Sequence, residues 1–91
     1  MSFSIIIPLY NEAENVIQLN TEILQALTSF KNTNYKFEII YVEDGSTDNT
    51  LESLKKFNNT IKTIIVKNIY NLGQSKSIMN GIDSSSYNNI I

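Results

Sequence analysis

Several residue types that build common active sites are missing from this sequence of 91 residues, which contains no cysteine, histidine, tryptophan or arginine. Without cysteine there is no disulfide, zinc thiolate or cysteine nucleophile. Without histidine there is no Ser-His-Asp triad or imidazole metal site. All seven basic residues are lysines, so bidentate arginine clamps on phosphate are excluded. With a net charge of -2 and no basic cluster, we expect no nucleic-acid partner.

Long hydrophobic runs are also missing. No apolar stretch approaches the roughly 20 residues that span a bilayer. The amino terminus has no lysine-rich start of a signal peptide, so we expect a cytoplasmic location. The composition, 42% hydrophobic and 18% charged, is typical of a globular chain, and the length allows one small domain, residues 1–91.

What is present is an alternation of strand-sized apolar runs with segments of helical spacing. Strands are expected at residues 3–8, 37–42, 61–66 and 87–91. Helices are expected from about residue 11 to 31–34, over 51–57 and over 73–83. This order is typical of right-handed βαβ units. The sequence therefore predicts an α/β fold, a Rossmann-like half-domain with a parallel sheet of three to four strands and helices on both faces.

In such sheets, ligands bind beyond the carboxyl ends of the strands. The alternation predicts that three loops meet at this rim: residues 9–14, 43–49 and 68–73. These loops also carry the most distinctive residues of the chain. We therefore expect any binding site to lie where they meet.

The first loop contains no glycine, which excludes both the dinucleotide fingerprint and the Walker phosphate loop. It does offer Tyr10, whose ring can pack on another ring, and main-chain groups around Pro8 that can bond a base edge. The alternative is structural: Tyr10 closes the end of the sheet, and Asn11 caps the first helix with Glu14 in the capping-box position.

The second loop follows a buried strand and begins with Glu43 and Asp44. Successive strand residues point to opposite faces, and we expect Asp44, directly before Gly45, to face the cleft. Its carboxylate can accept hydrogen bonds from a base N–H or a ribose hydroxyl, but it repels phosphate. Alternatively, Asp44 and Asp48 cap the next helix. A magnesium site made of Glu43, Asp44 and Asp48 is conceivable, but nothing in their spacing requires it.

The third loop leads through Gly73 into a helix whose first turn contains Lys76. A helix amino terminus with free N–H groups suits an anion. The alternative is an ordinary turn with Gly73 at positive φ and a solvated lysine. We reject a hairpin turn at Asn80-Gly81, because Ile78, Met79 and Ile82 keep helical spacing across it and are expected on the buried side.

Three segments together resemble the nucleotide-binding, amino-terminal half of the family-two inverting glycosyltransferases, which have the GT-A fold. They are Ser4–Glu12 (SIIIPLYNE), Glu38–Asp48 (EIIYVEDGSTD) and Asn71–Ser75 (NLGQS). In this order and at these separations they cover nearly the whole chain. The run from Gly73 to Gly81 looks most like the branch that moves sugars onto polyprenyl phosphates, such as the dolichol-phosphate mannose synthase-like enzymes.

The resemblance implies a nucleotide-binding site, and its candidate residues are Pro8, Leu9, Tyr10, Asn11, Glu12, Val42, Asp44 and Gly73. The sequence departs from the family at two places. Glu43 stands where members usually have aspartate, at the less critical of two adjacent acidic positions. Tyr70 stands where an arginine often precedes the asparagine of the third loop, so any contact made by that arginine is missing.

The resemblance also implies parts that these residues lack. In the family, the strand starting near Tyr87 leads to an Asp-x-Asp motif that holds a divalent cation on the diphosphate, and a later carboxylate acts as the base. The sequence ends at Ile91, before either. We therefore expect residues 1–91 to be the donor-binding part of the enzyme, truncated before the metal-binding motif.

For the full-length enzyme, the resemblance implies Mg²⁺ or Mn²⁺, a nucleotide-diphospho-sugar donor and a polyprenyl phosphate or glycan acceptor, at the cytosolic face of a membrane. For the chain alone we expect no catalytic residue, no metal ligand and no transferase activity. The alternative is a non-catalytic α/β module, or a gene fragment, that self-associates through an exposed sheet edge. A nucleotidyltransferase would need a first loop rich in glycine and arginine, which is absent.

Overall fold

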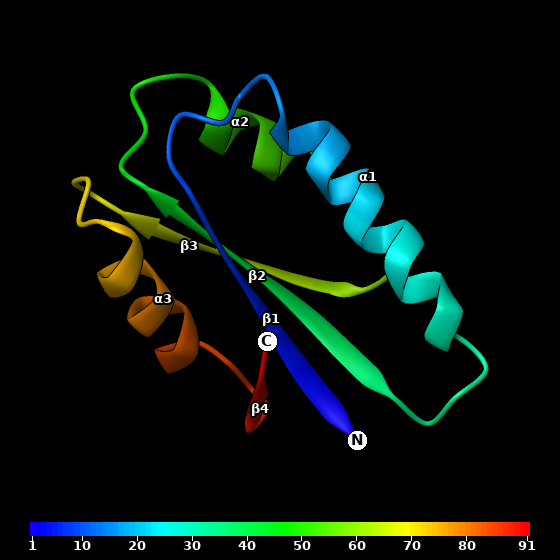
Figure 1. Ribbon diagram of the computed structural model, residues 1–91. Helices are drawn as coiled ribbons and strands as arrows, with labels where there is room; N and C mark the ends of the chain where they lie inside the picture. Colours follow the sequence, from blue (N-terminus) through cyan, green and yellow to red (C-terminus); the bar gives the residue numbers. More distant parts are fainter.

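A computed structural model describes all of residues 1–91 (Figure 1). Its strands form one parallel sheet. The strands are β1 (Ser2–Leu9), β2 (Lys36–Asp44), β3 (Lys62–Asn68) and β4 (Asn89–Ile90). Their order is β3-β2-β1-β4, and every pairing is parallel. The sheet confirms the predicted parallel arrangement of three to four strands, although β4 has only two residues.

Helices cover both faces of this sheet, as predicted. They are α1 (Val16–Leu27), which continues into the 3₁₀ turn η1 (Thr28–Phe30), α2 (Thr50–Lys55) and α3 (Gln74–Asp83). Helices α1 and α2 lie on one face, and α3 lies on the other (Figure 1). The fold is therefore a Rossmann-like α/β half-domain.

The core lies between β2 and the helices α1 and α2. Ile39 and Tyr41 are fully buried there, against Val16 of α1 and Leu54 of α2. Burying a side chain of this size contributes about 1.5–3 kcal/mol. Burial raises the pKa of Tyr41 to about 12. The Tyr41 hydroxyl is satisfied by donating to Asn20 Oδ1 at 2.8 Å.

Helix α3 packs on the opposite face through small residues, which corrects the sequence prediction. The helix does continue across Gly81, as expected. However, its buried positions are Ser77 and Gly81, whereas Met79 and Ile82 are exposed. A Cβ atom on Gly81 would lie 2.5 Å from Ile6 Cγ2. The helix therefore lies too close to the sheet for large side chains at the contact.

The first helix begins at Val16 rather than just after Asn11, so Asn11 is not its N-cap. Asn11 adopts a left-handed conformation with φ 53°, which ends the strand segment instead. Strand β1 also continues to Leu9, one residue past Pro8, where the predicted strand 3–8 ends. The Ile6 N–H bonds to Ile91, and the nitrogen of Pro8 faces the same side, where β4 has already ended. No neighbour needs a donor there, so proline is tolerated.

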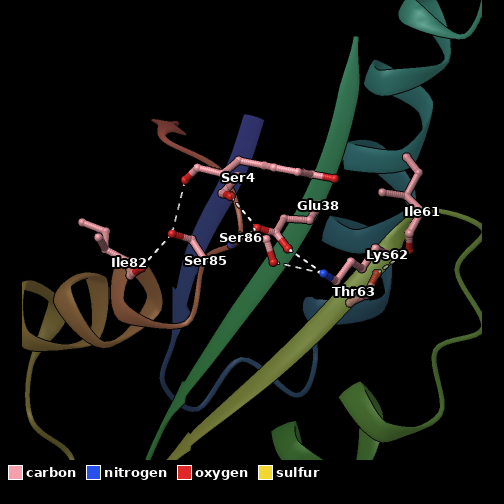
Figure 2. Close-up of polar contacts among 9 residues, drawn as sticks. Ser4, Glu38, Ile61, Lys62, Thr63, Ile82, Ser85 and Ser86 are labelled. Atoms are coloured by element: carbon pink, nitrogen blue, oxygen red, sulfur yellow. Dashed lines mark hydrogen bonds and ion pairs between the residues drawn. The ribbon is translucent and has the colours of Figure 1, made fainter. Parts of the chain in front are cut away.

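A buried carboxylate joins the strands near their amino ends (Figure 2). Ser4, Glu38 and Lys62 are aligned across β1, β2 and β3. Glu38 accepts hydrogen bonds from Ser4 Oγ at 2.5 Å and from the Ser86 N–H at 2.6 Å, and it lies 3.5 Å from Lys62 Nζ. Because Ser86 belongs to the α3–β4 connection, Glu38 fixes that connection against the sheet.

Candidate functional site

The three loops predicted to share a rim do meet at the carboxyl ends of the strands. The first and second loops are joined through Asn11. Its N–H donates to Ser46 Oγ at 2.9 Å, and its Oδ1 accepts from the Thr47 N–H at 2.8 Å. The Glu12 N–H donates to Thr50 Oγ1 at 2.9 Å. The positive φ of Asn11 thus turns its backbone and side chain toward the second loop, which explains its role better than helix capping does.

Asp44 joins the second loop to the third. Its Oδ1 accepts from Asn68 Nδ2 at 2.9 Å and from the Leu72 N–H at 2.8 Å. Its Oδ2 accepts from Asn71 Nδ2 at 2.9 Å and from the Gly73 N–H at 3.0 Å. A carboxylate has about four lone-pair positions, so all of them are occupied.

These contacts keep Asp44 charged. Burial raises the pKa of the carboxyl, but the hydrogen bonds from the Leu72 N–H, the Asn68 amide and the Gly73 N–H outweigh burial and hold the pKa below its usual range. The carboxylate sits just before α3, so it already supplies the negative charge that a helix amino terminus favours. A phosphate at the same position would be repelled.

Two glycines make this loop arrangement possible. Gly45 has φ 69°, and a Cβ atom there would lie 2.4 Å from the carbonyl carbon of Tyr70. The second and third loops are therefore in backbone contact that no larger residue permits. Gly73 has φ 93°, as the turn interpretation of this loop predicted, and it directs its N–H at Asp44.

A cleft of about 280 Å³ opens between the first loop, Asp44 and the third loop. Its lining consists of Pro8, Leu9, Tyr10, Glu12, Asp44, Asn71, Gly73 and Gln74. Six of the candidate residues from the sequence thus lie together around one space. The other two do not line it: Asn11 faces the second loop, and Val42 is fully buried beneath α3.

Asn71 and Gln74 line the cleft but were not selected from the sequence. Both lie within the third segment on which the family resemblance rests, NLGQS. Asn71 also donates to the Asp44 main-chain oxygen at 3.3 Å, so its amide caps the end of β2 as well as the carboxylate. The motif itself was the signal for both residues, but a single sequence could not say which of its side chains face inward.

The other acidic residues of the rim have structural partners. Glu43 points to the opposite face, is buried, and accepts from the Ser46 N–H at 2.7 Å. Asp48 accepts from the Thr50 N–H at 3.0 Å and the Ala13 N–H at 3.2 Å, which agrees with its capping interpretation. The Thr50 hydroxyl is the main reason that the pKa of Asp48 is lowered. No cluster of three or more metal-ligating side chains forms.

A larger groove of about 590 Å³ lies beside the cleft, along β1 and α1. It shares Pro8, Leu9 and Glu12 with the cleft, but it contains neither Asp44 nor any part of the third loop. Of its remaining polar side chains, Gln18 and Glu22 lie on α1, as on any solvated helix, and Asn15 directly precedes it. The smaller cleft is therefore the better candidate site.

A parallel α/β sheet whose loops enclose a cleft at the carboxyl ends of the strands defines a ligand-binding α/β domain. The chain belongs to the family described as Glycosyl transferase family 2, whose profile matches residues 4–91. No helix of the structure has the length and hydropathy to cross a membrane.

Among its relatives, the chain is 37% identical over its full length to an uncharacterised glycosyltransferase of Synechocystis sp. and covers 28% of that protein. It is 31% identical to a dodecaprenyl-phosphate galacturonate synthase of Rhizobium johnstonii, over 93% of the chain and 25% of the relative. It is 33% identical to a dolichol-phosphate mannosyltransferase of Pyrococcus furiosus, over 94% of the chain and 23% of the relative. The chain therefore spans about a quarter of these relatives.

Solved structures show the same fold. All of this chain superposes on 26% of Staphylococcus aureus TarS 1–349 in complex with UDP, with a TM-score of 0.81 and 24% identity. A second TarS structure matches over 100% of this chain and 16% of that chain, with a TM-score of 0.76 and 27% identity. The α/β architecture of the chain is therefore that of the amino-terminal part of a GT-A glycosyltransferase.

Proposed function

We propose that this chain is the donor-binding part of an inverting glycosyltransferase and that its cleft holds the nucleoside of a nucleotide-diphospho-sugar. The observation that carries the proposal is the convergence of Tyr10, Asp44 and Asn71 on one cleft from three separate loops. The candidate nucleotide-binding residues are those named from the sequence, with Asn71 and Gln74 added.

The cleft suits a flat, uncharged group. The exposed ring of Tyr10 offers a stacking surface, and the main chain around Pro8 offers hydrogen-bonding groups for a base edge. Asp44 has no free lone pair, so a base N–H must replace one of its present donors. Of the four donors to Asp44, only the Asn71 amide belongs to the side chain of an exposed residue. We propose that its amide moves aside when a nucleoside binds.

The diphosphate needs a different neighbourhood. Asp44 repels it, and the chain has no arginine to hold it. Mg²⁺ or Mn²⁺ would neutralise the diphosphate, but the carboxylates of Asp44 and Glu43 are already committed to N–H donors and do not fit a metal site. We propose that the carboxylates for the cation, the catalytic base and the contacts to a polyprenyl phosphate or glycan acceptor belong to parts of the full-length enzyme outside residues 1–91, and that the chain alone transfers no sugar.

The proposal predicts weak binding of free nucleosides and nucleotides, which NMR titration of the ¹⁵N-labelled chain measures. The TarS complex makes UDP and uridine the first probes. We expect amide shifts at Asp44, Asn71 and Gly73 at millimolar ligand. Because Asp44 stays charged, uridine should bind at least as tightly as UDP when no divalent cation is present. Replacing Tyr10 with alanine should weaken binding roughly fivefold by removing the stacking surface.

The matched control is Tyr10→Phe, which keeps the ring and should bind uridine as the wild type does. Tyr10 makes no hydrogen bond through its hydroxyl, so neither variant should disturb the fold. Guanosine nucleotides serve as the second probe. The absence of any shift near Asp44 with both bases, or equal binding by the alanine and phenylalanine variants, would contradict the proposed site.

A second function, a self-associating module without catalysis, is favoured by one observation. Both outer strands of the sheet, β3 and β4, lack a partner on their outer side. Open strand edges pair readily with other copies. Light scattering after size-exclusion chromatography tests this alternative, because a self-associating module gains mass as its concentration rises.

A further inference from the structure

The connection between β3 and α3 exposes the most accessible large apolar side chains of the molecule. Ile69 is 80% exposed and Tyr70 is 74% exposed, and Leu72 beside them is 41% exposed. We call these three residues the apolar rim patch. Single exposed apolar residues are normal on protein surfaces. Three exposed apolar residues within four consecutive positions, two of them more than 70% exposed, form a local apolar surface.

The backbone beneath the patch is held firmly. A Cβ atom on Gly45 would lie 2.4 Å from the Tyr70 carbonyl carbon, so the two backbones are in close contact. The Leu72 N–H donates to Asp44 at 2.8 Å, and the Asn71 amide donates to the same carboxylate. The polar groups of the loop thus face inward, while its apolar side chains face solvent. A rigid loop loses little conformational entropy when it meets a partner.

The charge around the patch differs from that of the chain as a whole. Residues 67–76 contain Lys67 and Lys76 and no acidic residue, whereas the whole chain has a net charge of -2. Both lysines are exposed. In the sequence, the patch therefore lies between two exposed lysines, while the Asp44 carboxylate that bonds to its backbone is buried and neutralised by no cation of this segment.

We propose that the apolar rim patch, together with Lys67 and Lys76, is a docking surface for an anionic lipid bilayer. Tyrosine and aliphatic side chains insert at the boundary between headgroups and acyl chains, and flanking lysines are attracted by anionic headgroups. The lysine flanks favour a lipid surface over a neutral protein partner. The inference goes beyond nucleoside binding, because none of these five residues lines the cleft.

Docking of this kind would fix the orientation of the cleft. Gly73, which lines the cleft, directly follows Leu72 of the patch, and the patch lies on the β3 side of the sheet, away from β4 and Ile91 (Figure 1). The loop that touches the bilayer would therefore also form one wall of the cleft. A ligand in the cleft would then lie close to the lipid headgroups.

The test is co-sedimentation of the chain with vesicles of phosphatidylcholine alone and of phosphatidylcholine with about a third phosphatidylglycerol, at millimolar total lipid. We expect binding to the anionic vesicles that weakens as salt is raised. Each of Lys67→Gln and Lys76→Gln should weaken it about fivefold. The double variant Ile69→Ser/Tyr70→Ser should weaken it roughly tenfold or more.

The matched control is Ile17→Ser/Lys55→Gln, which removes an exposed isoleucine and a lysine from helices α1 and α2 and should bind as the wild type does. Circular dichroism checks that every variant is folded. Failure to bind anionic vesicles, equal binding to neutral vesicles, or equal losses in the control and patch variants would each overturn the proposal. Self-association removed by Ile69→Ser/Tyr70→Ser, without vesicle binding, would overturn it in favour of a protein interface. Uridine titration is independent, so failure of the nucleoside site would be seen separately.

Discussion

Glu38 is a buried charge whose polar neighbours come from three other segments of the chain. Burial raises the pKa of its carboxyl, but the Ser4 hydroxyl, the Ser86 N–H and Lys62 outweigh burial, and the pKa stays below its usual range. Its Oε1 accepts no hydrogen bond, and its one polar partner is Lys62 Nζ, an ion pair at 3.5 Å (Figure 2). Removing the charge therefore changes several contacts together.

Replacing Glu38 with glutamine should destabilise the fold by about 2 kcal/mol at pH 7, because a neutral amide loses the lysine pairing and one acceptor oxygen. Since the folded pKa of Glu38 is lowered, its contribution is present above the unfolded value of about 4.3 and is lost as pH falls through the folded value. Urea unfolding at several pH values between neutral and acid should thus show the difference between variant and wild type shrinking on acidification.

The control is Glu14→Gln, which removes an exposed carboxylate with no hydrogen-bond partner and should leave the unfolding curve nearly unchanged at each pH. A Glu38→Gln variant whose stability deficit stays constant down to acid pH would show that the charge does not contribute.

Asp44 shows what the alternation of side chains along a strand can predict. Strand periodicity correctly assigned Asp44 rather than Glu43 to the cleft. It could not reveal that four N–H donors already occupy Asp44, because they come from residues 24 to 29 positions away.

At the scale of elements, α3 shows why helical spacing does not by itself identify a buried face. Its apolar residues suggested that Met79 and Ile82 pack inward, yet the sheet is met by Ser77 and Gly81. Both sets recur at intervals typical of a helix. Only the distance to the sheet decides between them, and that distance is set by Ile6 and Val42 on the neighbouring strands.

Replacing Gly81 with alanine tests this close contact. In an exposed helix the change would stabilise by about 1 kcal/mol through helix propensity. Here the new Cβ would lie 2.5 Å from Ile6 Cγ2 and 3.0 Å from Val42 Cγ2, so we expect a net destabilisation of about 1–3 kcal/mol, measured by urea unfolding.

The exposed control on the same helix is Met79→Ala, which should change stability by less than about 0.5 kcal/mol. An alanine variant more stable than the wild type would mean that α3 can shift outward without cost. In combination with Ile6→Ala, which removes the Cγ2 methyl opposite, Gly81→Ala should cost less stability than it does in the wild type if the contact is direct.

For the molecule as a whole, the two open edges of the sheet, β3 and β4, are the places where a second copy can pair. Strand β4 pairs with β1 over only two residues, and Ile91 beyond it is 64% exposed. Lysines at positions 62 and 67 interrupt the β3 edge, as charges on protected edges commonly do. The β4 side has no such charge, so self-association should involve that side.

Light scattering after size-exclusion chromatography should show a mass that rises above 10.3 kDa as the concentration is increased. Replacing Ile91 with lysine should reduce this rise, because a charge at the edge opposes strand pairing. The control is Ile17→Lys on α1, since Ile17 is 62% exposed and lies on no strand. A constant mass of one chain at every concentration would contradict the self-associating alternative.

The sequence alone determined the order of strands and helices, their parallel arrangement and the meeting of three loops at one rim. These features follow from local hydrophobic periodicity and from the handedness of βαβ connections, which any folded chain of this pattern obeys. The tertiary structure decided where α1 begins, which side of α3 is buried, how Asp44 is occupied and how Glu38 is paired. Each of these depends on distances between residues far apart in the chain, and such distances exist only once the sheet and its helices have packed.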